Sequence, residues 1–211
     1  MYKTQLSAKV ITLFPELFPG PLSASVTGRA LENKLWSLET INLKKYGKGR
    51  HKKVDDKPIS GGPGMILMPD VLDEAILKAN SLISGKNKLI VCMSPKGIPL
   101  NQNLVKNMAQ YNEIIIVCGR FEGIDQRVID KHKMKEISIG DFILTGGELG
   151  AMVLLDTLVR LLPGTLGNEE SIISKYEFES ELDIEKYCSE PYVVVWHLPA
   201  PMYTLSGLYP A

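Results

Sequence analysis

The strongest constraint on the fold is the alternation of short apolar runs with amphipathic segments as far as residue 162. The apolar runs have the length of buried strands, and the segments between them carry apolar residues at helical spacing. Strands that alternate with helices predict an α/β domain around a mostly parallel sheet. The predicted strands are residues 8–14, 36–43, 88–93, 113–119 and 135–140, and the predicted helices are residues 26–35, 69–84, 101–110, 123–132 and 147–162.

Composition agrees with a globular chain and argues against other classes. Hydrophobic residues make up 45% of the chain and charged residues 23%, as in ordinary soluble domains. No apolar run approaches the roughly 20 residues that span a bilayer, and the N-terminus lacks the pattern of a signal peptide. We therefore expect a cytoplasmic protein without a membrane segment. Cys92, Cys118 and Cys188 form no CxxC pair, which favours buried thiols and predicts no metal site.

The formal net charge is zero, but the charges are unevenly distributed. Residues 44–57, called the basic segment below, carry seven Lys or Arg residues and two Asp residues, with His51 among them. Residues 167–190 carry eight acidic residues and two lysines. Such asymmetry can place a phosphate-attracting patch on a neutral protein. A solvated loop has the same pattern, so charge alone leaves both interpretations open.

Three successive predicted strands are followed by loops that contain glycine, at residues 94–97, 120–123 and 141–150. Ligands of parallel sheets bind beyond the carboxyl ends of the strands, and glycine lets the backbone come close to a ligand. We therefore predict one pocket shared by these loops. The sequence has no GxxxxGK(S/T) motif and no clean GxGxxG motif after a strand, so a P-loop and an ordinary dinucleotide site are not predicted.

Residues 44–68 lack a periodic segment, which predicts a long stretch without regular structure, either a binding loop or a disordered segment. Its last part, ISGGPGM (59–65), is called the glycine loop below and follows the basic segment directly. A basic segment joined to a rigid glycine loop suits a substrate with a charged backbone and a base that must be positioned. A plain surface turn is the alternative.

Several motifs together resemble one enzyme family in the order in which they occur, from about residue 8 to 171. The family is that of the bacterial tRNA (guanine-37-N1)-methyltransferases, which belongs to the SPOUT superfamily. A set of co-linear motifs is far more specific than a single glycine pattern. The motifs are VTGRA (26–30), VDDKPISGGPGM (54–65), MSPKG (93–97), CGRFEGID (118–125), SIGDFILTGGELGAM (138–152) and PGTLGNEES (163–171).

The resemblance implies a domain organisation and an assembly. Residues 1–163 are expected to form the SPOUT-like methyltransferase domain with a deep trefoil knot, an exception to the rule that chains do not thread their own loops. Residues 164–190 are expected to be an acidic interdomain linker. Residues 191–211 are expected to be the start of a C-terminal tRNA-binding domain, which the resemblance implies is either truncated or lost in this member. The family also implies a homodimer whose active sites are shared between the subunits.

S-adenosylmethionine is the cofactor that the resemblance implies, bent against the knot and held mainly by backbone groups. Magnesium is a further candidate cofactor. The implied cofactor-binding residues are Met93, Ser94, Pro95, Gly119, Glu122, Gly123, Ile139, Gly140, Asp141, Phe142, Ile143, Leu144, Gly146 and Gly147.

The chemistry of the implied reaction requires a base and a cation. Guanine N1 carries a proton, so a carboxylate should accept that proton while a cation stabilises the negative charge that develops on O6. Arg160 matches the family's arginine that faces O6. Lys175 holds the position of the family's aspartate and is charged at neutral pH. Glu177 is the nearest acid, so we take Glu177 as the candidate proton acceptor.

The expected contacts with tRNA come from the basic segment and the glycine loop. The basic segment contains no acidic residue before Asp55, which predicts a local positive field around its lysines. The candidate RNA-binding residues are Lys44, Lys45, Lys48, Arg50, Lys52, Lys53, Gly61, Gly62 and Gly64.

Two other functions compete with this interpretation. The chain could be a SPOUT methyltransferase that acts on another RNA, since the knot loops would stay similar while the residues around the target base changed. It could also be a non-catalytic protein that binds RNA or S-adenosylmethionine, as Lys175 suggests. The glycine loop and Arg160 favour methylation of guanine 37.

Overall fold

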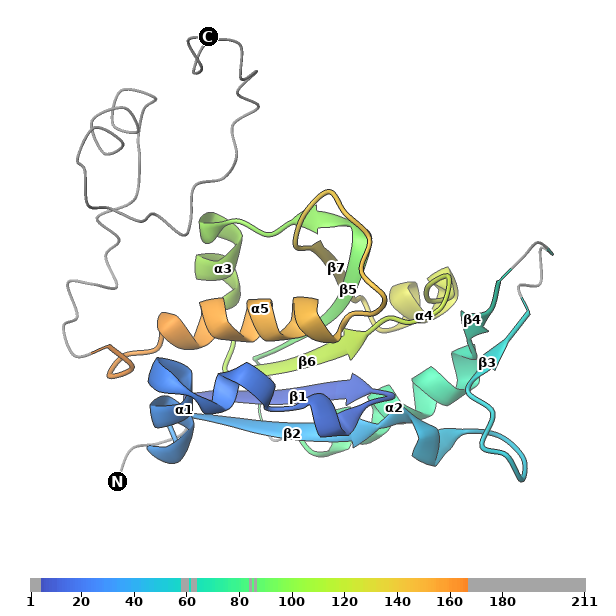
Figure 1. Cartoon of the computed structure of the whole chain (residues 1–211), viewed down its shortest axis with the longest axis horizontal. Coiled ribbons are helices and arrows are strands. Elements are labelled where there is room, and N and C mark those ends of the chain that lie inside the picture. The colour runs from blue at the N-terminus through green and yellow to red at the C-terminus, as the bar shows by residue number, and fades with distance from the viewer. Residues whose placement is uncertain (1–4, 58–60, 62–63, 84, 86, 167–211) are drawn as a thin grey trace, which may run out of the picture. The chain divides into compact units, whose positions relative to one another are not determined.

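The computed structural model describes residues 5–57, 61, 64–83, 85 and 87–166 (Figure 1). By its internal contacts the chain divides into residues 1–172 and 173–211, and the second part lies outside the described residues. The predicted linker from residue 167 onward and the predicted C-terminal segment 191–211 therefore stay predictions.

A five-stranded sheet forms the centre of the described part of the chain, and every pairing within it is parallel. The strand order is β2-β1-β6-β5-β7. This confirms the predicted α/β class with a mainly parallel sheet. The strands are β1 (Leu6–Thr12), β2 (Trp36–Asn42), β5 (Lys88–Pro99), β6 (Glu113–Cys118) and β7 (Lys135–Ser138).

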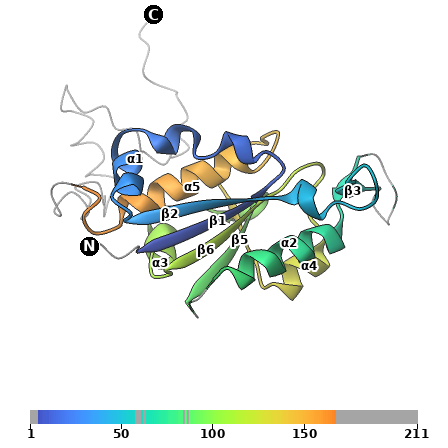
Figure 2. The same cartoon turned by 90° about the horizontal axis from the view of Figure 1, so that it is seen from below.

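Helices cover both faces of the sheet, and Figure 2 shows α1 and α5 on one face with α2 and α4 on the other. Alternate strand residues point to opposite faces, so Val10 and Ile116 pack with α1, α3 and α5 in one core. Ile11 and Ile115 pack with α2 and α4 in the other core. Buried residues on both faces explain the nearly continuous apolar strands. The helices are α1 (Ser25–Glu32), α2 (Pro69–Ser81), α3 (Gln102–Met108), α4 (Gln126–Lys131) and α5 (Glu148–Arg160).

Strand β5 continues beyond the predicted boundary at residue 93. The predicted loop 94–97 lies inside this strand as an irregularity, because Ile137 of β7 is in register with both Met93 and Ile98. Gly97 allows this close approach, since a Cβ atom there would lie 2.4 Å from the backbone nitrogen of Ile137. The glycine and proline of SPKG predicted a loop, but pairing with β7 on either side keeps the segment in the strand.

Residues 44–68 contain more regular structure than the sequence predicts. The 3-10 helix η3 (Leu43–Tyr46) begins the region, and β3 (Asp55–Asp56) pairs antiparallel with β4 (Ile66–Leu67). These elements are too short to produce a periodic pattern, so the prediction of a wholly irregular loop was wrong. Two further 3-10 helices, η1 (Pro15–Leu17) and η2 (Gly20–Ser23), follow β1.

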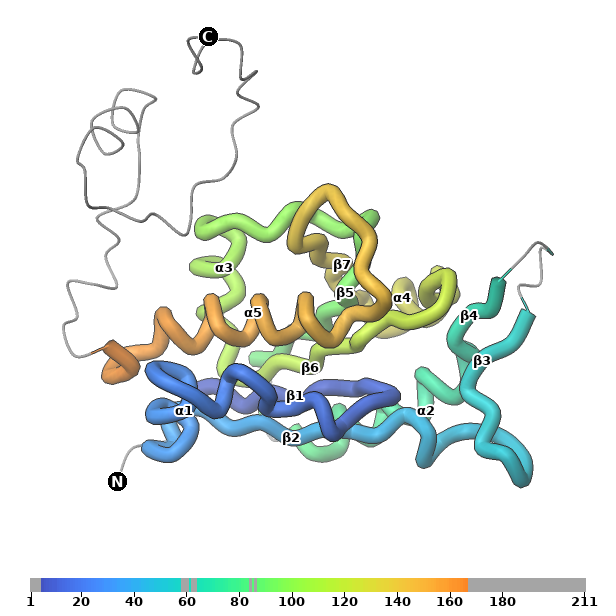
Figure 3. Tube along the Cα trace, viewed as in Figure 1, coloured from blue at the N-terminus to red at the C-terminus, as the bar shows by residue number. Residues whose placement is uncertain are grey.

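The path of the chain after β7 brings distant segments together (Figure 3). Strand β7 lies at the edge of the sheet, and residues 139–147 lead back to the carboxyl end of β6. There the backbone N–H of Gly147 donates to the carbonyl oxygen of Gly119 at 2.9 Å. Helix α5 then runs along one face of the sheet.

Candidate functional site

Two of the loops predicted to form one pocket, those after β6 and β7, meet at the carboxyl end of β6 beside Met93 of β5. A Cβ atom on Gly147 would lie 2.9 Å from both Cys118 Cα and the Gly119 nitrogen, and 3.1 Å from Met93 Cβ. A side chain at residue 147 would therefore push the returning backbone away from β5 and β6. Glycine at this position lets residues 139–147, called the return loop below, pack directly on the two strand ends.

The return loop exposes apolar side chains beside backbone polar groups. Phe142, Ile143 and Leu144 are all exposed, and Ile143 has 87% of its surface accessible. Met93 and Gly147 are buried beneath them, and Gly119 and Gly146 are partly buried. Such a surface suits a small ligand with an apolar portion and a polar portion that backbone groups can bind.

A buried ion pair, which the sequence analysis missed, joins the loop after β6 to the start of α5. Glu148 is 2% exposed, and its Oε2 lies 2.9 Å from Arg120 Nη2. Thr12, the last residue of β1, donates its hydroxyl to Glu148 Oε1 at 2.8 Å. The only sequence signal was an acid at the start of a strongly apolar helix. Its partners are distant in sequence, so that signal could not identify them.

Phe14 connects this pair to the basic segment. The guanidinium carbon of Arg120 lies 4.5 Å from the centroid of the Phe14 ring, and Lys44 Nζ lies 5.1 Å from it. Both distances are within the range of cation–π attraction. The basic segment therefore begins beside the loop that follows β6.

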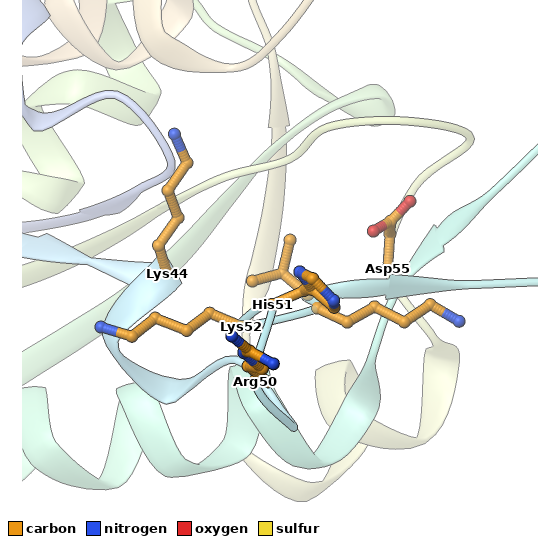
Figure 4. Close-up of a pocket in the computed structure, with 7 residues that line it drawn as sticks. Lys44, Arg50, His51, Lys52 and Asp55 are labelled. Carbon is orange, nitrogen blue, oxygen red and sulfur yellow. The ribbon is translucent and has the colours of Figure 1, made fainter.

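The basic segment lines a shallow pocket, and Figure 4 shows how its side chains lie there. Not all of its lysines contribute a free positive charge, however. Lys48 Nζ lies 2.7 Å from Glu74 Oε1 and 3.4 Å from Asp70 Oδ2, both on α2. Lys53 Nζ lies 2.8 Å from Asp56 Oδ1, and its hydrogen bond holds the pKa of Asp56 below the usual range. The pocket is lined by Lys44, Arg50, His51, Lys52, Lys53, Val54 and Asp55.

These ion pairs correct the expectation of an uninterrupted positive field. The acids of α2 lie far along the sequence from Lys48, so the spacing of charges in the basic segment could not reveal them. Among the candidate RNA-binding residues of the basic segment, those that form no ion pair with an acid in the described part of the chain are Lys44, Lys45, Arg50 and Lys52, and all four are exposed.

The glycine loop meets the loop that follows β6. The backbone N–H of Glu122 donates to the carbonyl oxygen of Met65 at 2.9 Å. Gly64 has a φ of +94°, and a Cβ atom there would lie 2.4 Å from Glu122 Cγ. The structure thus brings together one loop predicted to bind RNA and one predicted to bind the cofactor. Gly61 is described as well, whereas Gly62 lies outside the described residues.

Arg160 does not lie beside these loops within its own chain. It is the last residue of α5 and exposed, whereas Glu148 at the first position is buried next to the loops. Twelve residues separate the two positions, which at a rise of 1.5 Å per residue places them roughly 18 Å apart along the helix. Lys175 and Glu177 lie outside the described residues.

The described residues give little support for a metal site, a membrane-spanning helix or a reactive cysteine. No three His, Cys, Asp or Glu side chains gather there in a group that could hold a metal ion. Among the helices described, none is long and apolar enough to cross a bilayer. Cys92 and Cys118 are buried, and burial raises the pKa of the Cys92 thiol to about 12. Such thiols are poor nucleophiles, because the thiolate is the reactive form.

Sequence comparison relates the chain to one group of enzymes. The family model described as tRNA (Guanine-1)-methyltransferase TrmD matches residues 6–209. A tRNA (guanine-N(1)-)-methyltransferase of Ehrlichia canis is 46% identical over 183 residues, which cover 86% of this chain and 77% of the relative. The protein of that name from Ruegeria pomeroyi is 48% identical, over 78% of this chain and 67% of its own length. A third, from Cereibacter sphaeroides, is 44% identical, over 89% of this chain and 76% of its own length.

Proposed function

The chain belongs to the tRNA (guanine-1)-methyltransferase family, and we propose that it transfers a methyl group from S-adenosylmethionine to N1 of guanine 37 in tRNA. One observation carries the proposal. The glycine loop, with its basic segment, is hydrogen-bonded to the loop after β6 through Glu122 and Met65. RNA bound by the first loop would therefore lie next to a cofactor bound by the second.

The loops after β6 and β7, together with the irregular part of β5 at residues 94–97, offer groups that suit S-adenosylmethionine. Backbone N–H and C=O groups near Gly119 and Gly140 suit the adenosine, and the exposed ring of Phe142 offers apolar contact. A Cβ atom at residue 140 would lie 2.2 Å from an atom of the Phe142 ring, so a side chain there would displace this exposed ring. When bound, S-adenosylmethionine supplies an electrophilic methyl group on its sulfur. The main task of the chain is to hold N1 in line with that methyl group.

Arg160 and Glu177 are the proposed catalytic residues. Guanine N1 must lose its proton as the bond to the methyl carbon forms. The guanidinium of Arg160, placed near O6, stabilises the negative charge that develops there. Glu177 accepts the proton, because Lys175 at the family's aspartate position is charged at neutral pH and has no free lone pair.

A homodimer with shared active sites explains the position of Arg160. Arg160 lies far along α5 from the return loop of its own chain. We therefore place its guanidinium at the return loop of a second copy. The exposed apolar side chains of Ile143, Leu149 and Val153 support such an assembly, since Leu149 has 60% of its surface accessible. Apolar side chains grouped on one helix and the adjoining loop are typical of a surface that a partner covers.

The remaining proposals follow from membership of the family. The return of the chain from β7 to β6 suits the deep trefoil knot of SPOUT proteins. Modification of tRNA suits an enzyme of the cytoplasm. Magnesium stays a candidate second cofactor, which a chelator added to the methylation assay tests.

Action on another RNA is the second candidate function. The site around the cofactor would be the same, so only the substrate distinguishes the two. The test is transfer of a labelled methyl group to unmodified tRNA and, in parallel, to ribosomal RNA. We expect 1-methylguanosine in the digested tRNA. Labelled ribosomal RNA with unlabelled tRNA would favour the second candidate, and no label in either would contradict both.

A further inference from the structure

One guanidinium connects the return loop to the buried start of α5. Arg120 Nη2 lies 2.9 Å from Glu148 Oε2, and Arg120 Nε donates to Glu148 Oε1 at 3.3 Å. The other arm of the guanidinium, Nη1, donates to the carbonyl oxygen of Thr145 at 3.0 Å. Thr145 belongs to the return loop, so Arg120 joins that loop to a fixed point in the core.

Several contacts hold Glu148, the residue to which Arg120 is bound, in place. Glu148 also accepts the hydroxyl of Thr12 at 2.8 Å, and Thr12 in turn accepts the backbone N–H of Phe14 at 2.9 Å. The Phe14 ring lies against the guanidinium of Arg120. Glu148 begins α5, where the helix dipole favours a negative charge. Packing and hydrogen bonds therefore hold the guanidinium in one orientation.

Residue 146 shows how closely the loop fits this pair. A Cβ atom on Gly146 would lie 2.3 Å from Arg120 Nε and 2.6 Å from Glu148 Oε2. The backbone of the return loop therefore passes directly over the ion pair. Two residues away, Leu144 is the last of the three exposed apolar residues of the loop.

We propose that Arg120 is a positioning residue, which sets the conformation of the return loop that S-adenosylmethionine requires. The inference rests on the proposed function. Arg120 acts through the Thr145 carbonyl and need not contact the cofactor. An arginine is required, because its planar fork can donate to Glu148 and to Thr145 at once. A lysine has a single ammonium group, which can neutralise Glu148 without also holding the loop.

Two variants separate positioning from simple stabilisation. Arg120→Lys keeps a positive charge beside Glu148, so the buried carboxylate is not left unpaired. The double variant Arg120→Gln with Glu148→Gln removes both charges, and replacing both members of a buried pair is often tolerated. Arg127→Gln is the matched control, because the exposed Arg127 also forms an ion pair, with Asp125 at 2.7 Å, and follows Arg120 closely in the chain.

The measurements are the melting temperature and the Kd for S-adenosylhomocysteine by calorimetry on the full chain. We expect both test variants to melt near the wild type and to bind about tenfold or more weakly, because small displacements of a binding loop are costly. The KM for S-adenosylmethionine should rise more than kcat falls. The control should bind like the wild type.

Two results would overturn the inference. If Arg120→Lys and the double variant bind S-adenosylhomocysteine within twofold of the wild type, Arg120 is only a structural residue. If one of the two test variants unfolds, the other decides the outcome. If both unfold while the control folds, the Arg120–Glu148 pair serves only stability and the inference fails. Wild-type protein that binds no cofactor would contradict the proposed function itself, which is a different result.

Discussion

Arg160 is the residue proposed to face guanine O6. It is exposed at the last position of α5, roughly 18 Å along the helix from the loops proposed to bind the cofactor. An exposed arginine at a helix C-terminus can simply interact with the helix dipole. A catalytic role and this structural one make different predictions for an alanine variant.

We expect Arg160→Ala to lower methyl transfer by about 10²–10³-fold while the Kd for the cofactor stays nearly unchanged, as for loss of one charge-stabilising donor. Single-turnover rates and calorimetry measure the two quantities. Arg29→Ala, an exposed arginine on α1, is the control and should leave both unchanged. Equal losses of rate and affinity in Arg160→Ala would indicate a structural residue.

Single residues differ in how far the sequence predicts them. The loop glycines could be predicted, because glycine after consecutive strands indicates close backbone approach, and Gly147 does lie against Cys118 and Gly119. The Glu148–Arg120–Thr12 cluster could not be predicted. Glu148 is 136 residues from Thr12 and 28 from Arg120, and no local pattern specifies contacts over such separations.

At the scale of elements, the basic segment is divided by ion pairs into two groups of side chains. Lys48 forms ion pairs with acids of α2. The exposed residues that form no ion pair with an acid in the described part of the chain include Lys44, Lys45, Arg50 and Lys52. Hydrogen bonds to Glu74 and Asp70 raise the pKa of Lys48. A lysine already paired with carboxylates releases fewer counterions when RNA binds.

Salt dependence of tRNA binding should therefore differ within the basic segment. Replacing Lys45 or Lys52 with glutamine should reduce the slope of log K against log salt by roughly one, because one phosphate contact is lost. Lys48→Gln is the control within the same segment and should change the slope much less. Filter binding between low and moderate salt measures the slopes. If every variant has the same slope as the wild type, the basic segment is only solvated surface.

A second contact between elements joins α2 to α4. Asp73 Oδ2 accepts from Lys131 Nζ at 2.8 Å, and Asp73 Oδ1 lies 2.6 Å from His132 Nε2. The hydrogen bond from Lys131 is the main cause that lowers the pKa of Asp73 below its usual value of 3.8, and burial opposes it. A lowered carboxylate pKa stabilises the fold above the unfolded-state pKa, and this stability is lost as pH falls through the folded-state pKa.

Asp73→Asn should therefore destabilise the protein at neutral pH and have less effect in acid. We expect a loss of roughly 1 kcal/mol or less, as is usual for partly exposed ion pairs. The difference from wild type should be present at neutral pH and should shrink as the pH falls below about 4. Urea unfolding at several pH values measures it, with Asp130→Asn on the exposed face of α4 as the control. A difference that does not vary with pH would contradict this account.

The elements themselves were largely predictable, and their ends were not. Five buried strands and five helices follow from alternating apolar patterns, and each is present. Strand β5 extends to Pro99 because β7 pairs with it beyond the irregularity at residues 94–97. The pairing partner is decided by tertiary structure, so the sequence of β5 alone could not show that it continues.

For the whole molecule, the central question is which copy of the chain supplies each part of a site. The proposed homodimer places Arg160 of one copy at the return loop of another. Two inactive variants should then complement each other, provided that their defects lie in different parts of the shared site.

Mixing Arg160→Ala with Gly140→Val tests this arrangement. A valine at residue 140 would displace the Phe142 ring, and we expect it to prevent cofactor binding. After unfolding and refolding together, half of the dimers are mixed and each has one intact site, so about a quarter of wild-type activity should return. Each variant refolded alone is the control and should stay inactive. No recovery in the mixture would mean that each chain completes its own site.

The identity of the methylated atom tests the central claim most directly. Two tRNA transcripts that differ only in guanine or adenine at position 37 are incubated with the enzyme and S-adenosylmethionine labelled in its methyl group. We predict label in the guanine-37 transcript alone, recovered as 1-methylguanosine, with a reverse-transcription stop at position 37. Equal labelling of both transcripts, or a stop at another nucleotide, would contradict the proposed function.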